Sequence, residues 1–367
     1  MDEIAPKMRR ESLIEEFHIV GITHRRAPIE VRERLAVAPP EWEASTRQLC
    51  EQSGIAEAVI LPSCLRSEFY VCGPRAEARA GVEEFWRVRF RVRPEDFRRF
   101  ALFRSGPEAV RHLFHVLAGL DSLFVGEHQM RRCGEESLAA AECAGAAGPV
   151  LRRIFTAALQ SAAEIQSETR LGRRNITKCQ AVVEMVEKIF GSLENRTVLL
   201  LGGGHACEPV IRDLKRAAPE RILASSPEEA EAAALARLSG RLVTVLPWKD
   251  VLAAASEADV VINTSITEPK VLRRADYEKI RPLRQKRALF LLDMAMPRGF
   301  DPALKTHGEV FLYTIDDMAG VAQSYQNRYS NEIEEAEAIA DRNLEQFLRE
   351  LETNPLPSPF AEIKSQY

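Results

Sequence analysis

The feature that most constrains the fold is an apolar run followed directly by three glycines. Residues 198–201 are all Val or Leu, and a helical pattern begins at Glu208. A buried strand, a glycine turn and a helix in this order are typical of a dinucleotide-binding turn. The first glycine permits a tight turn, and the second lets the backbone approach a pyrophosphate. The predicted cofactor-binding residues are Gly202, Gly203, Gly204, His205, Ala206 and Cys207, with Cys207 in place of the usual third glycine.

Further apolar runs follow at the spacing of strands in a parallel sheet. They cover residues 221–224, 242–245, 258–263, 288–293 and 310–313, with helical patterns between several of them. This alternation predicts a Rossmann-type, doubly wound sheet. Residues 225–227 are Ser-Ser-Pro, where an acidic residue would bind the ribose of NAD and an arginine the 2′-phosphate of NADP. The pattern therefore disfavours NAD and only permits NADP.

The first part of the chain predicts a smaller domain in which strands and helices alternate. The expected strands cover residues 17–22, 58–61 and 69–72, and the expected helices cover 29–35 and 39–52. Cys64 lies on the turn between the last two strands, with Arg66 two residues further on. A thiol beside a fixed cation is a candidate nucleophile, although a lone cysteine is commonly a small buried hydrophobe. We expect an α/β multidomain chain whose N-terminal α+β catalytic domain is ferredoxin-like.

An arginine-rich stretch follows. Arginines alternate with Val and Phe over residues 87–93, which would place them on one face if the stretch were extended. One interpretation is a phosphate-binding face, since guanidinium groups bind phosphate oxygens without reading sequence. The other is a solvated face paired with nearby acids such as Glu84 and Asp96.

The remaining segments are mostly helical. His112 lies beside the apolar face of a helix predicted over residues 108–118. A long helix is predicted from Asp316 to about Thr353, with no Gly beyond Gly320 and no Pro before Pro355. At 1.5 Å per residue this helix would be about 55 Å long, so we expect a spine that packs along other domains. The predicted domains are residues 1–172 (catalytic), 173–313 (dinucleotide-binding), 314–353 (spinal helix) and 354–367 (tail).

Composition and charge exclude several classes of protein. No apolar run approaches the roughly 20 residues that span a bilayer, and the charged N-terminus lacks a secretory pattern, so we expect a cytoplasmic location without membrane contact. The seven cysteines are scattered without a C-x-x-C pair, which argues against a zinc ribbon or a disulfide framework, and no metal site is predicted. The net charge of −4 excludes a generally basic nucleic-acid binder.

Taken in order, the motifs resemble those of glutamyl-tRNA reductase over nearly the whole chain. Residues 21–35 are similar to its N-terminal signature, and Ser63-Cys64-Leu65-Arg66 is similar to its Thr-Cys-Asn-Arg loop. Residues 112–114 and 119–129 resemble its His-Leu-Phe and Gly-Leu-Asp-Ser stretches, and residues 293–298 and 313–317 resemble two further blocks. The motifs are specific as a set, because no single one would identify the family.

The resemblance implies a mechanism and a site. Cys64 would attack the ester carbonyl of glutamyl-tRNA to form a thioester, and NADPH would supply the hydride that releases glutamate-1-semialdehyde, the first step of tetrapyrrole (porphyrin) synthesis from glutamate. His112 would be the second catalytic residue, and Arg66 would hold the substrate carboxylate. The other implied substrate-binding residues are Ser63, Leu65, Ser122, Glu127, His128, Gln129 and Cys133.

The sequence departs from the family at several of these positions. Leu65 stands for Asn, Cys133 for a substrate-side Gln, and residues 225–227 for Asn-Arg-Thr. One alternative is therefore a non-catalytic relative with a binding or regulatory role in the same pathway, and another is a thioester enzyme with a different substrate. The family usually continues into a helical dimerisation domain, so we expect a monomer or weak dimer. The downstream glutamate-1-semialdehyde aminotransferase is a further implied partner.

Overall fold

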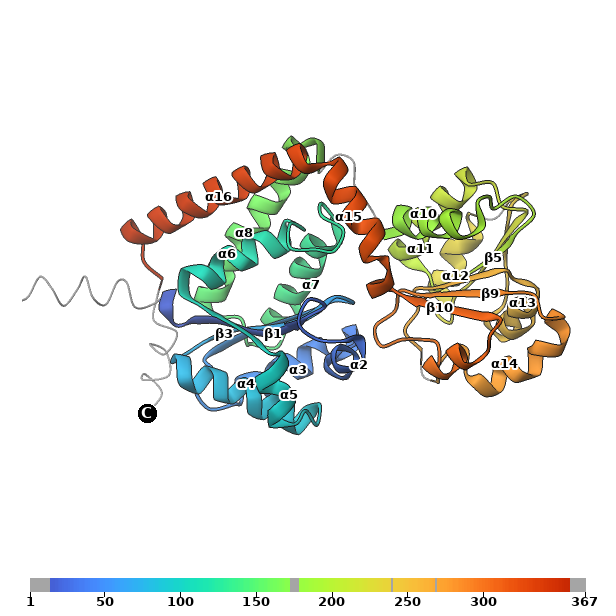
Figure 1. Cartoon of the computed structure of the whole chain (residues 1–367). Helices are drawn as coiled ribbons and strands as arrows, with labels where there is room; N and C mark the ends of the chain where they lie inside the picture. Colours follow the sequence, from blue (N-terminus) through green and yellow to red (C-terminus); the bar gives the residue numbers. More distant parts are fainter. Residues whose placement is uncertain (1–13, 172–177, 239, 268, 357–367) are drawn as a thin grey trace, which may run out of the picture. The chain divides into compact units, whose positions relative to one another are not determined.

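The computed structural model describes residues 14–171, 178–238, 240–267 and 269–356. The chain divides into two compact units. The first unit combines Met1–Ile176 with Gln326–Tyr367, and the second unit is Thr177–Tyr325. Figure 1 shows the elements of both units coloured along the sequence. In the described part of the chain, every helix is too short or too polar to cross a bilayer.

The first unit is built on an antiparallel sheet of order β2-β3-β1-β4. Two helical connections join these strands in the order strand, helix, strand, strand, helix, strand, so the predicted ferredoxin-like domain is confirmed. The sequence analysis missed β4. The elements are β1 (Phe17–Thr23), α2 (Ile29–Arg32), α3 (Trp42–Cys50), β2 (Glu57–Pro62), β3 (Arg66–Cys72), α4 (Arg75–Arg89), α5 (Pro94–Phe100) and β4 (Leu102–Ser105).

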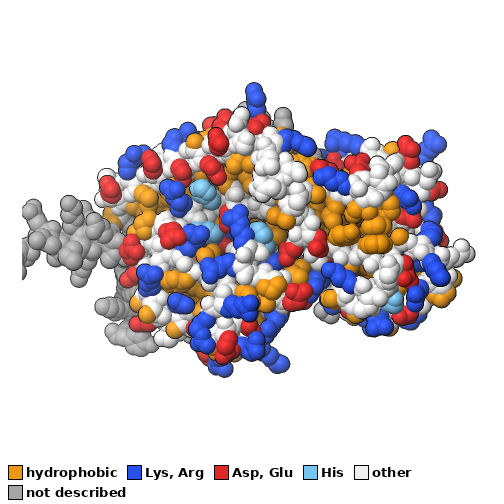
Figure 2. Space-filling view, viewed as in Figure 1, with side chains coloured by type: hydrophobic (Ala, Val, Ile, Leu, Met, Phe, Trp, Pro, Cys, Tyr) orange, Lys and Arg blue, Asp and Glu red, His pale blue; other side chains and the backbone are white. Residues whose placement is uncertain are grey.

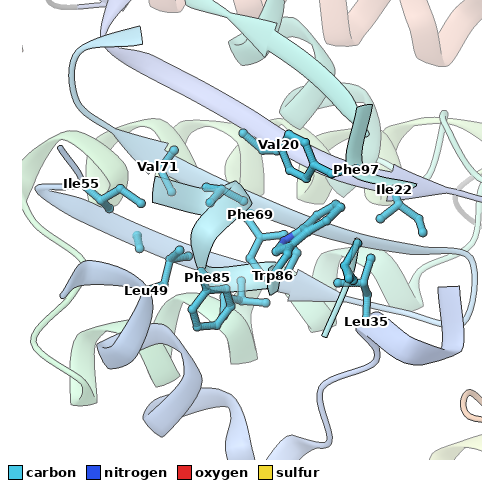
Figure 3. Close-up of a cluster of buried hydrophobic side chains, with 14 of the residues drawn as sticks. Val20, Ile22, Leu35, Leu49, Ile55, Phe69, Val71, Phe85, Trp86 and Phe97 are labelled. Carbon is cyan, nitrogen blue, oxygen red and sulfur yellow. The ribbon is translucent and has the colours of Figure 1, made fainter. Parts of the chain in front are cut away.

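An aromatic core lies between this sheet and helices α3 to α5 (Figure 3). Phe69 of β3 lies 5.4 Å from the ring of Trp86, which in turn lies 5.0 Å from Phe97. Helices α6 (Gly106–Leu117) and α8 (Pro149–Glu168) also contact the strands. Every residue of β3 is consequently buried, including charged residues that face away from the aromatic core. The candidate site is built on those charged residues.

The arginine-rich stretch does not form an extended strand. It begins in the last turn of α4 and continues into a turn in which Arg91 has φ of 53°. Several of its guanidinium groups are paired with acids: Arg87 lies 2.6 Å from Glu84, and Arg93 lies 3.1 Å from Asp96. The alternating residues therefore lie at the end of a helix. The ion pairs favour the interpretation of a solvated, acid-paired face over that of a phosphate-binding face.

The long C-terminal helix is present, but it is divided. Helices α15 (Ala319–Arg328) and α16 (Ser330–Thr353) meet at Tyr329, whose φ and ψ of −118° and 24° are not helical. The prediction of one uninterrupted helix from Asp316 was wrong on this point. The bend lies near the boundary between the two units and contains no Gly or Pro. Packing of α16 on α6 and α8, with Phe347 5.9 Å from Phe114, therefore decides its direction.

The second unit is a six-stranded parallel sheet of order β10-β9-β8-β5-β6-β7. The strand order reverses at β5, so the predicted doubly wound Rossmann-type sheet is confirmed. Its strands are β5 (Thr197–Leu201), β6 (Arg221–Ser225), β7 (Val243–Val245), β8 (Val260–Asn263), β9 (Leu289–Asp293) and β10 (Val310–Thr314). Its helices include α10 (Lys178–Phe190), α11 (Gly204–Arg216), α12 (Glu229–Ala236), α13 (Val251–Glu257) and α14 (Arg274–Ile280).

Hydrophobic side chains also gather on the surface of the second unit (Figure 2). Phe290 of β9 stacks against Phe311 of β10 at 4.7 Å and meets Phe190 of α10 at 4.4 Å. Phe311 is 41% exposed. This aromatic surface lies on α10 and on strands β9 and β10.

Candidate active site

Cys64 lies on a short turn held by its neighbours. The amide N of Ser63 donates to the carbonyl of Arg66 at 2.7 Å, and Ser63 Oγ accepts from the amides of Leu65 and Arg66 at 3.3 and 3.2 Å. The amide of His24, after β1, donates to the carbonyl of Leu65 at 2.8 Å. These bonds fix the backbone on both sides of Cys64, whose side chain is half-buried. The predicted turn between two strands is confirmed.

Arg66 begins β3 and is fully buried among carboxylates. Its Nη1 lies 3.1 Å from Glu68 Oε1 and 3.1 Å from Asp121 Oδ2, and its Nη2 donates to the backbone carbonyl of Asp121. Asp121 also pairs with the exposed Arg25 at 3.0 Å. Two carboxylates thus neutralise the guanidinium that the resemblance assigns to the substrate. Glu68 is completely buried, whereas the Asp121 side chain is 22% exposed and is the partner that a ligand can reach.

Glu68 also orients His112. His112 Nε2 lies 2.9 Å from Glu68 Oε1, and the hydroxyl of Tyr70 donates to Glu68 Oε2 at 2.6 Å. Burial opposes ionisation of Glu68, but the charges of His112 and Arg66 and the hydrogen bonds outweigh it and lower its pKa to about 2. An ionised carboxylate only accepts, so Nε2 of His112 carries a proton. The ring is therefore held in one orientation, with Nδ1 3.9 Å from Asp121 Oδ2.

The predicted substrate-binding residues downstream lie on the loop between α6 and α7 (Gln129–Cys143), and on α7 itself. Ser122 and Glu127 are buried on this loop, and Gln129 begins the helix after His128. Gly119 has φ of 74°, and a side chain there would strike the backbone of Glu127, so the loop needs a glycine at this point.

Two of the predicted substrate-binding residues, Cys133 and Leu65, lie close to Cys64 in different ways. Cys133, one turn into α7, donates its thiol to the carbonyl of Pro62 at 3.1 Å, two residues before Cys64. Cys133 therefore lies beside the turn that carries Cys64. Leu65, by contrast, is only 3% exposed and packs into the interior. Its side chain adds no polar group to the site, although its backbone holds the turn.

The glycine turn of the second unit lies at the switch point of the sheet. Gly202 follows β5 with φ of 117°, and α11 begins at Gly204. A side chain on Gly202 would strike Thr264 Oγ1 at the end of β8, so the backbone of the two strand ends is in contact. Cys207 is buried, with its Sγ 3.3 Å from Thr264 Oγ1. The side chains of His205 and Ala206 lie outside the described residues.

This geometry fits the pyrophosphate of a nicotinamide dinucleotide. The turn follows the first strand of a doubly wound sheet, its first glycine requires a positive φ, and a long helix starts from it. The fit is poorer at the position of the 2′-phosphate of NADPH. There Ser226 Oγ donates to Glu231 Oε2 at 2.7 Å, which places a carboxylate beside the turn.

A hollow of about 450 Å³ opens next to this position. It lies between the loops that follow β6, β7 and β8, and a volume of this size suits a small-molecule site. Its lining is mixed in charge and polarity and includes Pro227, Glu228, Trp248, Lys249, Ile266, Thr267, Lys270 and Arg273.

Comparison with known proteins decides the family. The model of the N-terminal domain of glutamyl-tRNA(Glu) reductase matches residues 20–169, and the model of shikimate/quinate 5-dehydrogenase matches residues 184–321. A glutamyl-tRNA reductase of Syntrophotalea carbinolica is 31% identical over 345 residues, which cover 93% of this chain and 77% of that protein. The chain belongs to the glutamyl-tRNA reductase family. Glutamyl-tRNA reductase 2 of Anaeromyxobacter dehalogenans is 33% identical, with 94% of this chain and 76% of that protein covered.

A solved structure is also similar. The glutamyl-tRNA reductase from Methanopyrus kandleri is 27% identical, with a TM-score of 0.49, and the match covers 92% of this chain and 81% of that one. Within the glutamyl-tRNA reductase family, this chain has both units described above: the first contains Cys64 and His112, and the second contains the glycine turn.

Sequence reasoning missed the residues that hold the site together. The sequence assigned no role to Glu68, Asp121, Tyr70 or Arg25, which all lie in or beside the predicted strands and motifs. An acid beside apolar strand residues, as Glu68 is between Leu61 of β2 and Gly21 of β1, is a signal that could have been used. Glu231 was missed because it follows the expected acidic position by several residues.

Proposed function

We propose that this protein is a glutamyl-tRNA reductase, which reduces the ester carbonyl joining glutamate to its tRNA and releases glutamate-1-semialdehyde. The observation that carries the proposal is the similarity to curated reductases over 93% of the chain. The match to the N-terminal family model spans both Cys64 and His112. A half-buried thiol on a rigid turn beside a buried arginine is consistent with this role.

In the proposed reaction, the thiolate of Cys64 attacks the ester carbonyl carbon. The bond to the tRNA 3′-oxygen breaks, that oxygen takes a proton, and a glutamyl thioester remains on Cys64. The glycine turn at Gly202 and Gly203 would hold a reduced nicotinamide dinucleotide, whose hydride would convert the thioester to the aldehyde. Cys64 then leaves as a thiolate, which is a good leaving group and is ready for a second turnover.

The charge network suggests how the substrate is held. We infer that a carboxylate of the substrate takes the place of Asp121 on Arg66, since Asp121 is reachable and Glu68 is not. Arg25, already 3.0 Å from Asp121, gives the displaced carboxylate a partner. His112 stays oriented by Glu68 during this exchange and lines the site. Arg66 thus keeps two carboxylate partners throughout, which avoids a buried unpaired charge.

Several finer points remain predictions of this proposal. The family resemblance implies NADPH as donor, but the choice between NADPH and NADH depends on the groups beside the adenosine ribose. A cytoplasmic location, a monomer or weak dimer, and transfer of product to the glutamate-1-semialdehyde aminotransferase are also predicted. Sedimentation of the purified chain, alone and with the aminotransferase, tests the last two.

The decisive experiment separates acylation from reduction. Purified protein is mixed with glutamyl-tRNA without a dinucleotide, and the thioester on Cys64 is detected by mass spectrometry of the intact chain or by release with hydroxylamine. Adding NADPH or NADH should then give the aldehyde, detected by its reaction with a hydrazine. Binding of glutamyl-tRNA without any thioester would instead favour the non-catalytic alternative.

A further inference from the structure

The carboxylate of Glu231 lies against the glycine turn. A methyl group placed on Gly203 would come within 2.7 Å of Glu231 Oε2. The carboxylate is held in place by Ser226, whose hydroxyl donates to it at 2.7 Å and accepts from the amide of Glu228 at 3.2 Å. Glu231 is half-buried in the first turn of α12, so its position is set by the fold and by this hydrogen bond.

In doubly wound folds, the ends of the first two strands form the site that binds the adenosine ribose. The turn after the first strand approaches the pyrophosphate, and an acid near the end of the second strand binds the ribose 2′-hydroxyl. In this chain those two strand ends are joined directly, because the amide of Gly202 donates to the carbonyl of Ser225 at 2.8 Å. Residues 225–227 contain no acid or arginine, but Glu231 reaches this position from the following helix.

We propose that Glu231 determines which dinucleotide this reductase accepts, and that it selects NADH over NADPH. This inference rests on the proposed function, whose hydride donor it specifies. A carboxylate beside the ribose accepts hydrogen bonds from its hydroxyls, and such charge-assisted bonds are stronger than neutral ones. The same carboxylate repels a 2′-phosphate, which would carry about −1.5 to −2 charges at neutral pH.

Three cations line the neighbouring hollow and could compete as phosphate ligands. Arg273 is paired with Asp276 at 2.8 Å, and Lys270 donates to the backbone carbonyl of Arg298 at 2.6 Å. Lys249 is exposed on the loop after β7 and is the candidate that could still reach a phosphate. Two of these three cations are thus already engaged, whereas the carboxylate of Glu231 is held against the glycine turn by Ser226.

The test measures binding without turnover. Isothermal titration of the full chain with ADP-ribose and with 2′-phospho-ADP-ribose compares two ligands that differ only in the phosphate. The wild type should bind ADP-ribose at least about 10-fold more tightly, since one charged contact commonly contributes that much. Glu231→Gln should reduce this ratio severalfold. Glu229→Gln removes the same charge from an exposed position on the same helix and should leave the ratio unchanged.

A gain of binding gives the second test. The double variant Ser226→Arg with Glu231→Ala should prefer 2′-phospho-ADP-ribose, because an arginine then faces the 2′-phosphate without a competing carboxylate. The proposal is overturned if the wild type binds both ligands equally, prefers the phosphorylated one, or binds neither. It is also overturned if Lys249→Ala, rather than Glu231→Gln, changes the ratio. Circular dichroism confirms that each variant is folded.

The failure of this inference can be told apart from failure of the proposed function. Formation of the Cys64 thioester from glutamyl-tRNA requires no dinucleotide. A chain that forms the thioester but prefers 2′-phospho-ADP-ribose would be a reductase that uses NADPH. Only the proposed selection of NADH by Glu231 would then be wrong. A chain that prefers ADP-ribose but forms no thioester would keep the assignment of Glu231 and lose the proposed function.

Discussion

The two units contain two candidate sites that are built in different ways. Around Cys64, the functional side chains are held by a buried network in which Arg66, Glu68, Asp121 and His112 each contact another member. At the glycine turn, the binding geometry lies in the backbone, where Gly202 adopts a φ of 117° and packs on the end of β8. A side-chain network cannot lose a member without leaving a buried charge, whereas a backbone turn keeps its shape while the side chains beside it change.

The largest effect should follow from removing the nucleophile. Cys64→Ser should lower the rate of aldehyde formation by at least about 10³-fold, since a serine hydroxyl is far less ionised than a thiol at neutral pH. Cys143→Ser, at an exposed cysteine, is the matched control and should retain activity. A Cys64→Ser variant that still forms the aldehyde would remove the basis for treating the first unit as a catalytic site.

A substitution in the buried network around Arg66 should cost more folding stability than a side-chain substitution beside the glycine turn. Glu68→Gln should lower the free energy of unfolding by about 3 to 5 kcal/mol, because Arg66 loses a buried charged partner. The measurement is urea unfolding followed by circular dichroism. Glu43→Gln, which breaks the exposed pair with Arg47, should change little. Equal effects of the two substitutions would contradict the network's structural role.

The two units should respond to acid in opposite directions. The pKa of Glu68 is lowered to about 2 from 4.5, so its stabilisation is full above pH 4.5 and is lost as the pH falls towards 2. Burial raises the pKa of Asp293 in the second unit to about 6 from 3.8. The protonated Asp293 is favoured by the fold, so stability is gained as the pH falls from 6 towards 3.8, by about 3 kcal/mol at most.

Hydrogen exchange can follow the two units separately. Between pH 7 and pH 5, after correction for intrinsic exchange rates, the amides of β9 should become more protected, and those of β3 should not. Asp293 accepts the amide of Phe300 at 2.8 Å and a hydrogen bond from Asn263 at 3.0 Å, so the effect should be centred at the end of β9. Protection in β9 that stays constant or falls on acidification would contradict a raised pKa for this carboxylate.

The backbone turn should tolerate side-chain change but not a change at its glycine. Gly202→Ala should weaken ADP-ribose binding by at least about 10-fold, because the new Cβ strikes Thr264 and the φ of 117° is strained for alanine. Gly240→Ala is the matched control, since a Cβ there meets open space and φ is unremarkable. Unchanged binding by Gly202→Ala would show that the ligand does not depend on this turn.

The smallest effect concerns the arginine-rich stretch. Arg87 is exposed and paired with Glu84, so Arg87→Ala should leave both the thermal midpoint and the affinity for glutamyl-tRNA unchanged within error. The measurement is a tRNA titration at two salt concentrations. A weaker affinity with a smaller dependence on salt would restore the phosphate-binding interpretation of this stretch.

Patterns formed by residues close together in the chain were predictable. The strands of the parallel sheet, the turn that carries Cys64 and the helix that carries His112 were all placed from local sequence. A strand, a turn or a helix is specified by the periodicity and backbone preferences of neighbouring residues. The order of the motifs was likewise sufficient to indicate the glutamyl-tRNA reductase family. Strand β4 was missed because its four residues are half-buried and lack a clear alternation.

The contacts between distant residues were decided by the tertiary structure. Arg66 meets Asp121 across 55 positions, and Glu68 meets His112 across 44, because α6 packs against the sheet. Glu231 reaches Gly203 only through the placement of α12 beside the turn, so an acid that the local pattern lacked is supplied from another element. The sequence by itself thus determined most of the elements and the family to which the chain belongs. The fold alone decided which charges meet, since electrostatic partners depend on distance in space rather than along the chain.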